Sequence, residues 1–163
     1  MRKLQECVRI ATYNIHRAVG SDGRENPERI VAVLHELDAD IVALQEVGYA
    51  AGTPGNLLEY LGESIQSRVV EGVTFQDERG HYGNAVLSRL PLAGIQRRDI
   101  SVAGREPRGA IELNLLVNGT VMQFIATHLG LRPGERRYQV ERLTGLLAAS
   151  SADIKILLGD LNE

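Results

Sequence analysis

The chain has 163 residues, of which 44% are hydrophobic and 24% are charged, and its net charge is −3. These values predict one globular domain with a sizeable core, and they argue against a strongly basic nucleic-acid binder, which needs many Lys and Arg residues. The single cysteine, Cys7, excludes an intramolecular disulfide framework. Because no apolar run reaches the ~20 residues of a membrane span, and the first residues lack an apolar signal core, we expect a cytoplasmic protein without a transmembrane segment.

The first part of the sequence predicts a strand, a helix and a second strand. Residues 7–15 alternate β-branched and aromatic side chains with others, which indicates a strand. Asn26 and Pro27 are the residue types that begin helices, and apolar residues at helical spacing follow them. Residues 41–44 form a near-continuous apolar run, which is typical of a strand covered on both faces. This order predicts a strand–helix–strand crossover unit.

The second part of the sequence predicts short strands and then a long helix. Asn118-Gly119 is a strong hairpin signal, and Pro133 is placed to begin a helix. A final strand is expected after Asp153, whereas residues 48–56 are expected to form a loop. The other predicted elements are a short helix at 57–61 and strands at 66–76, 83–88, 92–102, 109–117 and 120–128. Strands flanked by helices at both ends predict an α+β fold of two packed sheets with helices outside.

Polar side chains follow four of the predicted apolar strands. Asp160 and Asn162 come two residues apart at the end of the last strand, so extended backbone would point them to the same face. Asn14, Glu46 and His128 end three earlier apolar stretches in the same way. We therefore expect these side chains to form a single site.

Glu46 and Asn14 are the candidate metal ligands. An ionised carboxylate at the end of an apolar strand is costly unless another group compensates its charge, and Mg²⁺ prefers oxygen ligands of this kind. Asn14 could bind the same cation through its carbonyl oxygen or hold a phosphate through its amide. A solvent-exposed strand end for Glu46 and a turn-capping role for Asn14 are the alternatives.

His128, Asp160 and Asn162 are the candidate catalytic residues. His128 could donate a hydrogen bond to a phosphoryl oxygen as charge develops there, and the alternative is a buried structural histidine. Asp160 could take a proton from an attacking water molecule, with Asn162 orienting that water or the phosphate. The alternative for this pair is an ordinary junction between a strand and a turn.

Two further residues are candidates for contact with a substrate phosphate. Arg108 precedes a predicted strand and could bind a phosphate through two hydrogen bonds, although a lone arginine in a loop is more often a surface charge. Asn84 stands just before an apolar strand and is another candidate polar strand end.

Six motifs, in this order, resemble the endonuclease/exonuclease/phosphatase superfamily of DNase I-like proteins. The motifs are T-Y-N-I-H, L-Q-E, G-N-A-V-L-S, P-R-G-A, T-H-L and G-D-L-N. The resemblance covers residues from about 9 to 163 and implies a four-layer α/β/β/α sandwich. It also implies in-line attack of water on a phosphoester, with a metal ion that neutralises developing charge. Small phosphoesters, lipid headgroups and nucleic acids remain open as substrates.

The resemblance assigns roles to individual residues of this chain. Glu46 matches the main ligand of Mg²⁺ or Mn²⁺, and Asn14 matches the same metal site. The other matches are the phosphate-stabilising His128, the water-activating Asp160, its partner Asn162 and the phosphate-contacting Arg108.

The sequence departs from the family pattern in two respects. His16 stands where abasic-site endonucleases tend to carry Asp or Asn, which weakens an assignment to DNA repair. Family members also continue beyond G-D-x-N to a Ser-Asp-His motif. We therefore expect residues 1–163 to form one domain that corresponds to the N-terminal two-thirds of an incomplete sandwich, without its C-terminal strands.

An incomplete sandwich has consequences for association and activity. Its open sheet edge could pair with a second copy of the chain. We expect little or no activity from this chain alone. The alternative function is that of a truncated, non-catalytic module that binds a metal or a partner.

Overall fold

The computed structural model describes residues 7–50 and 52–163. The elements in chain order are β1 (Ile10–Asn14), the short 3₁₀ helix η1 (His16–Ala18), α1 (Pro27–Leu37), β2 (Ile41–Tyr49), α2 (Leu57–Ser64), β3 (Arg68–Asp77), β4 (Gly80–Ser88), β5 (Leu92–Asp99), β6 (Gly109–Val117), β7 (Thr120–His128), α3 (Pro133–Ala149) and β8 (Ile154–Asp160).

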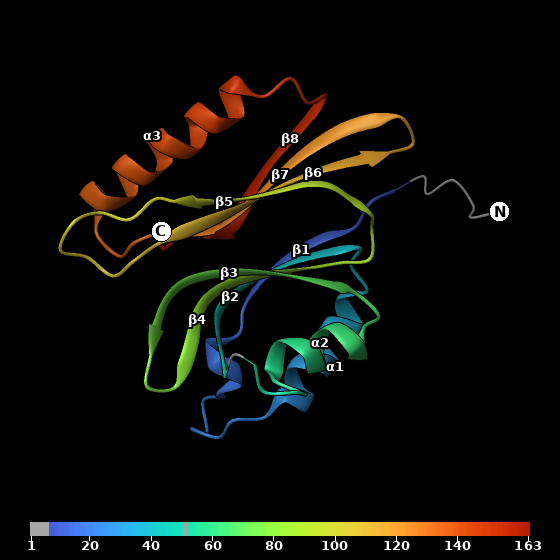
Figure 1. Cartoon of the computed structure of the whole chain (residues 1–163), viewed down its shortest axis with the longest axis vertical. Helices are drawn as coiled ribbons and strands as arrows, with labels where there is room; N and C mark the ends of the chain where they lie inside the picture. The colour runs from blue at the N-terminus through green and yellow to red at the C-terminus, as the bar shows by residue number, and fades with distance from the viewer. Residues whose placement is uncertain (1–6, 51) are drawn as a thin grey trace.

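The strands form two four-stranded sheets that pack face to face. The strand order is β1-β2-β4-β3 in the first sheet and β5-β6-β7-β8 in the second. The pairs β1/β2 and β7/β8 are parallel, and the other neighbouring pairs are antiparallel. Helices α1 and α2 cover the outer face of the first sheet, and α3 covers the outer face of the second (Figure 1). The predicted four-layer α/β/β/α arrangement is therefore confirmed.

Three apolar clusters hold these layers together. Leu34 of α1 packs with Leu44 of the first sheet in the first cluster, and Leu143 of α3 packs with Ile125 of the second sheet in the third. The middle cluster, which includes the fully buried Phe124, joins the two sheets. Each such side chain contributes about 1.5–3 kcal/mol through its removal from water. Because the middle cluster fixes one sheet against the other, it also fixes the relative positions of their strand ends.

Side-chain caps explain where the first two helices begin. The Asn26 side chain accepts a hydrogen bond from the Arg29 backbone N–H at 3.1 Å, and Pro27 is the first helical residue, as predicted. The Asn56 side chain caps α2 by accepting hydrogen bonds from the backbone N–H groups of Leu58 and Glu59, at 3.0 and 3.2 Å. Helix α2 then continues to Ser64, beyond the predicted end at residue 61.

The hairpin between β6 and β7 is confirmed, together with the bounds of both strands. Asn118 and Gly119 have φ values of 51° and 83°, so both central residues are left-handed, as a two-residue type I′ turn requires. Val117 pairs with Thr120 directly beside the turn.

Several other predicted boundaries were wrong. Strand β2 continues through Gly48 and Tyr49, which were predicted as loop residues, because both pair with β4. Strand β4 begins at Gly80 rather than at residue 83, since the turn before it is tighter than expected. Strand β5 ends at Asp99 rather than at residue 102.

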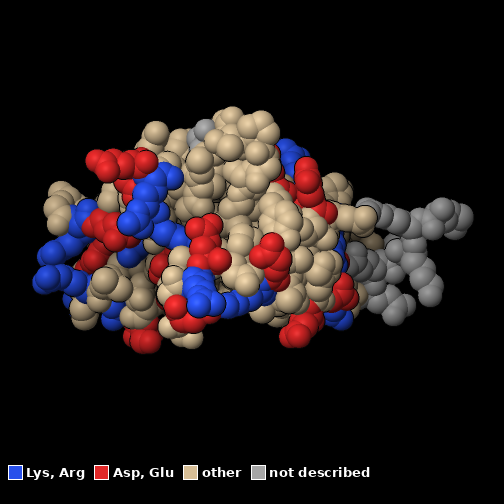
Figure 2. All heavy atoms as spheres, turned by 90° about the horizontal axis from the view of Figure 1, so that it is seen from below, with Lys and Arg blue, Asp and Glu red and all other residues tan. Residues whose placement is uncertain are grey.

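The surface seen in Figure 2 carries basic and acidic side chains beside one another. This mixture agrees with the small net charge of −3. Within residues 7–50 and 52–163, no helix is both long enough and apolar enough to cross a membrane. In the same part of the chain, β1 and β3 are the edges of the first sheet and β5 and β8 those of the second. Pairing of two copies through such an edge stays a prediction.

Candidate active site

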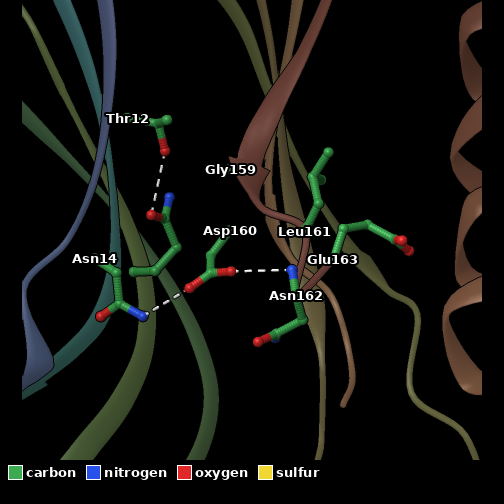
Figure 3. A pocket seen from close by; sticks show the side chains of 8 residues that line it. Thr12, Asn14, Gly159, Asp160, Leu161, Asn162 and Glu163 are labelled. Carbon is green, nitrogen blue, oxygen red and sulfur yellow. Dashed lines mark hydrogen bonds between the residues drawn. The ribbon is translucent and has the colours of Figure 1, made fainter. Parts of the chain in front are cut away.

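The two sheets bring three predicted site residues into contact. Asn14 is the last residue of β1, and Asp160 is the last residue of β8. The Asn14 side-chain amide nitrogen Nδ2 donates to Asp160 Oδ2 at 3.0 Å, across the boundary between the sheets (Figure 3). The same nitrogen donates to Glu46 Oε1 at 2.8 Å. Two carboxylates from different sheets therefore converge on one amide.

Glu46 reaches this position from a β-bulge, not from a strand end as predicted. The register of β2 against β4 shifts between Leu44 and Val47, so the strand continues on both sides of the carboxylate. Glu46 has a φ of 54°, a left-handed conformation that costs a non-glycine residue about 1 kcal/mol or more. Bulges of this kind redirect a side chain out of the regular alternation. This bulge turns the carboxylate toward Asn14.

Both carboxylates are held in their ionised form. Burial acts to raise the pKa of Glu46, but hydrogen bonds from Asn14 and His16 outweigh it and leave that pKa below its ordinary value. Burial likewise acts to raise the pKa of Asp160, and hydrogen bonds from Asn14 and the Asn162 backbone outweigh it. At neutral pH the site therefore contains two negative charges.

The donor set fits a hard divalent cation. Two anionic carboxylates share a neutral amide as a common hydrogen-bond donor, so a cation nearby would relieve their repulsion. Among the residues that the structure describes, no three His, Cys, Asp or Glu side chains converge into a complete metal cage. Mg²⁺ commonly needs only one or two carboxylates, because water and substrate phosphate supply its other ligands. The Glu46 carboxylate is the anionic group available for such a cation. Asn14 turns its amide nitrogen to the carboxylates, while its carbonyl oxygen accepts from the His16 N–H at 3.1 Å, so its predicted role as a metal ligand stays a prediction.

His128 lies beside this group as a neutral imidazole. Burial lowers its pKa below the ordinary value of 6.5, and the positive charge of Arg108 lowers it further. Arg108 Nη1 lies 3.4 Å from His128 Nδ1, and a guanidinium can only donate hydrogen bonds. Nδ1 must then accept, which places the ring proton on Nε2. Nε2 lies 3.8 Å from Asp160 Oδ2, on the side of the carboxylates.

Arg108 is buried, so the alternative of a surface charge is wrong. Only 7% of it is exposed, and its guanidinium forms an ion pair with Glu106 at 2.9 Å. A buried charge is tolerated when it is paired in this way. Arg108 therefore supports His128 from behind, and its direct contact with a phosphate stays a prediction.

The imidazole of His128 is expected to titrate below pH 6.5, because burial and Arg108 both disfavour the imidazolium. In Arg108→Gln, which removes the neighbouring positive charge, the pKa should rise toward 6.5. The unfolded chain binds more protons than the folded protein between the folded-state pKa and 6.5, so stability should fall as the pH drops through that range. Imidazole NMR signals followed against pH measure the shift. Arg105→Gln, an exposed substitution in the same loop, should leave the pKa of His128 unaltered. An unchanged His128 pKa in Arg108→Gln would contradict the effect assigned to the Arg108 charge.

Asn162 supports Asp160 through a hydrogen bond from its backbone, not by lying on the same face of an extended strand as predicted. Strand β8 ends at Asp160, and Asn162 has a φ of 55°, so the two residues do not share one extended face. The Asn162 backbone N–H donates to Asp160 Oδ1 at 3.0 Å (Figure 3). The Asn162 side-chain amide donates to the Leu129 carbonyl at 2.7 Å. Asn162 thus fixes the orientation of the Asp160 carboxylate. Its contact with water or phosphate stays a prediction.

Asn84 lies inside β4, not at the strand end as predicted. Its side chain is buried, and its amide donates to the Gly109 carbonyl at 3.0 Å. Thr127 Oγ1 donates to the same carbonyl at 3.2 Å. Asn84 therefore holds the first residue of β6, next to Arg108. Its role as a phosphate ligand stays a prediction.

One residue that sequence reasoning did not assign to the site contacts it directly: His16 Nδ1 lies 3.0 Å from Glu46 Oε2. Next to it, the Arg17 guanidinium lies 4.4 Å from the centre of the Tyr82 ring, which is close enough to Glu46 to sense its charge. Burial raises the pKa of Tyr82 to about 12, with a further contribution from the negative charge of Glu46. His16 could have been found from its spacing, because it follows Asn14 by two residues within the first motif.

An open hollow of about 610 Å³ lies beside the shared amide, between the edges formed by β1 and β8. It is bordered by Thr12, Asn14 and Gln45 on one side and by residues 159–163 on the other (Figure 3). Gln45 Nε2 is a buried donor without a hydrogen-bond partner among the described residues. The volume lies within the range of small-molecule sites.

Comparison with known proteins identifies the family. A sequence model of the endonuclease/exonuclease/phosphatase family matches residues 11–163. The chain belongs to this family. The present chain is 31% identical, over 169 residues, to YbhP, an uncharacterized protein from Escherichia coli K12. The match covers 95% of this chain and 66% of YbhP.

Solved structures share the fold. An endonuclease/exonuclease/phosphatase from Beutenbergia cavernae is 29% identical with a TM-score of 0.70, over 95% of this chain and 47% of that protein. The mannosyl-6-phosphatase Bt3783 from Bacteroides thetaiotaomicron is similar in fold alone, with 17% identity and a TM-score of 0.76, over 96% of this chain and 66% of that protein. The chain therefore spans about two thirds or less of the length of these relatives. The predicted superfamily is confirmed.

Proposed function

We propose that this protein hydrolyses phosphoesters with the help of a divalent cation, Mg²⁺ or Mn²⁺. The observation that carries the proposal is the convergence of Glu46 and Asp160 on the Asn14 amide, with the neutral His128 beside them. Membership of a family of nucleases and phosphatases supports the same chemistry.

The Glu46 carboxylate would hold the cation, and Asn14 would join it through its side-chain oxygen, which accepts from the His16 N–H in this structure. When bound, the cation would neutralise charge on the phosphoryl group during in-line attack of water. The Asp160 carboxylate, ionised at neutral pH, accepts a hydrogen bond from the attacking water and receives its proton as the new bond to phosphorus forms. The bond from phosphorus to the leaving oxygen breaks on the opposite side, and the leaving oxygen takes a proton from solvent water. Asn162 keeps that carboxylate in a fixed orientation through its backbone N–H.

His128 would act on the phosphoryl group. Its Nε2–H is directed to the carboxylate side of the site and can donate to a phosphoryl oxygen. The Arg108 guanidinium behind the ring keeps the imidazole neutral and adds positive potential where negative charge develops. Removal of such a donor typically lowers a rate by about 10²–10³-fold.

The substrate class follows from size and charge. The open hollow suits a small phosphoester or a lipid headgroup, and the mixed charge on the face in Figure 2 lacks the extended basic surface that long duplex DNA favours. We therefore place small phosphoesters and lipid headgroups before long nucleic acids. A synthetic phosphodiester and a synthetic phosphomonoester, compared directly, separate phosphodiesterase from phosphatase activity.

Hydrolysis of bis(p-nitrophenyl) phosphate is expected only with added Mg²⁺ or Mn²⁺, and excess EDTA should abolish it. The rate of this chain alone is expected to be low, so the assay needs high protein concentration and long incubation. Asp160→Asn should lower the rate by about 100-fold or more, to the level without protein, because the amide cannot receive the proton of the attacking water. Asp153→Asn, at the opposite end of β8, should change the rate less than about twofold, since exposed sites rarely affect a distant reaction.

Two outcomes would count against hydrolysis. Turnover that persists in Asp160→Asn would exclude the proposed role of that carboxylate. Cation binding without turnover on either synthetic substrate would favour the non-catalytic, metal-binding alternative.

A further inference from the structure

A strained turn directly follows the site residue Asn14. His16, Arg17 and Ala18 have φ values of 46°, 55° and 60°, so three consecutive residues other than glycine are left-handed. Such conformations are unfavourable, and they persist only where the surrounding structure imposes them. They are concentrated at functional sites for this reason.

Contacts on both sides of the turn impose this conformation. Ala18 is 3% exposed, and its N–H donates to the Ile15 carbonyl at 2.8 Å. Arg17 reaches away from the site, where Nη2 donates to Asp77 at 3.3 Å and the guanidinium covers the Tyr82 ring. With its two neighbours anchored, the turn presents the His16 side chain beside Glu46, with 67% of that side chain exposed.

His16 and Glu46 meet in one contact although both residues are strained. His16 Nδ1 lies 3.0 Å from Glu46 Oε2, and the His16 N–H donates to Asn14 Oδ1 at 3.1 Å. Glu46 is also left-handed, with a φ of 54°. An exposed polar contact of this kind returns less free energy than two such conformations cost. Stability of the folded protein therefore does not explain why these two groups are held together.

The separation of the two atoms suits a shared metal ion. Ligand nitrogen and oxygen atoms lie ~2.1 Å from a first-row metal ion such as Zn²⁺, so two ligands at right angles are about 3.0 Å apart. His16 Nδ1 and Glu46 Oε2 are separated by 3.0 Å. Imidazole nitrogen binds divalent first-row transition metals, Mn²⁺ the most weakly among them, whereas Mg²⁺ binds oxygen from carboxylates, carbonyls and water.

We propose that His16 is a nitrogen ligand of the cation that Glu46 holds and that it shifts the preference of the site from Mg²⁺ toward Mn²⁺. The proposal rests on the proposed cation site and adds a ligand and a metal preference to it. His128 is not the imidazole concerned, because its Nδ1 faces the Arg108 guanidinium and its Nε2 is 3.8 Å from Asp160. His16 is the exposed imidazole in contact with the proposed metal ligand.

Pulsed EPR of the full chain with Mn²⁺ tests the proposal without any activity assay. A directly coordinated imidazole gives a ¹⁴N coupling, which should be present in the wild type and in His128→Asn and absent in His16→Asn. Asparagine suits the test because it tolerates left-handed backbone better than most residues, so the turn at residue 16 is preserved. His35→Asn, an exposed histidine on α1, is the matched control and should keep the coupling.

Titration of the same variants with each cation gives the second measurement. His16→Asn should weaken Mn²⁺ binding about tenfold or more and Mg²⁺ binding less than about threefold, because only the transition metal gains from the imidazole. A ¹⁴N coupling that survives in His16→Asn, or one that disappears in His128→Asn, would overturn the proposal. Mn²⁺ binding that requires Glu46 but shows no ¹⁴N coupling in the wild type would overturn it and leave the proposed function intact. Failure of the wild type to bind Mn²⁺ would overturn both.

Discussion

Glu46→Gln is expected to weaken Mn²⁺ binding by about 100-fold or more and, with it, to remove metal-dependent hydrolysis. The glutamine keeps the size of the side chain and an oxygen that can accept from Asn14 Nδ2, which now donates to Glu46 at 2.8 Å. The negative charge and the anionic ligand are lost. Loss of a residue that only supports a ligand already costs about 10–100-fold in affinity, so loss of the ligand itself should cost at least as much. Calorimetric titration with Mn²⁺ measures the effect.

A loss of binding must be separated from a loss of the fold. Glu46 and Asp160 are two ionised carboxylates on the same amide, so Glu46→Gln removes their repulsion. The variant is therefore expected to melt at the wild-type temperature or above it. Glu141→Gln, an exposed carboxylate on α3, is the control and should keep full affinity. Wild-type affinity in Glu46→Gln would show that the cation binds elsewhere.

The convergence of the site could be predicted because it depends on a simple property of sheets. Asn14 and His128 end apolar strands that each pair in parallel with another strand, and the carboxyl ends of parallel strands meet at one edge. Asp160 ends the partner strand of His128 in the same register. The family resemblance of the six motifs predicted the four-layer arrangement, in which the edges of the two sheets lie together.

The local backbone of the site could not be predicted, since it departs from regular alternation. The β-bulge at Glu46 and the left-handed residues His16 and Asn162 all have positive φ values without being glycine. The alternation of side chains with a period of two residues holds only in a continuous strand. The prediction from this alternation therefore placed Asn162 on the same face as Asp160, and it placed Glu46 at the end of a strand. Glycine is the usual left-handed residue, and asparagine is expected in this conformation mainly within tight turns, so nothing in the sequence marked Glu46, His16 or Asn162 as left-handed.

The burial of Arg108 could not be predicted either, because it depends on partners from other segments. An arginine in a loop is normally exposed. Here Glu106 neutralises the guanidinium at 2.9 Å, and His128, twenty residues later in the chain, lies against it at 3.4 Å. The pairing of β6 with β7 brings these segments together, and no local pattern encodes that contact.

Gly159→Ala is expected to destabilise the fold by about 3 kcal/mol or more and to disturb the site at the same time. Gly159 has a φ of 149°, which side chains rarely adopt, and an added Cβ would overlap the carbonyl oxygen of Thr127. That oxygen belongs to the backbone of β7, so it cannot rotate away. Left-handed strain and overpacking each cost about 1–3 kcal/mol. Thermal unfolding should shift downward by roughly 6–12 °C for a domain of this size.

Gly145→Ala provides the matched control. Gly145 lies in α3 with open space at its Cβ position, so alanine should stabilise the helix by about 0.5–1 kcal/mol. The two substitutions add the same methyl group and should act in opposite directions. If Gly159→Ala melted like the wild type, the close approach of β8 to Thr127 would be wrong.

The consequence for function follows from the register of β7 and β8. Thr127 pairs with Gly159, and the next pair along is His128 with Asp160. A backbone that moves to admit a methyl group at residue 159 therefore moves Asp160 relative to His128 and Asn14. The His128 imidazole signals should shift in Gly159→Ala and stay unchanged in Gly145→Ala. The glycine of the G-D-L-N motif thus allows the close strand contact that places the aspartate after it.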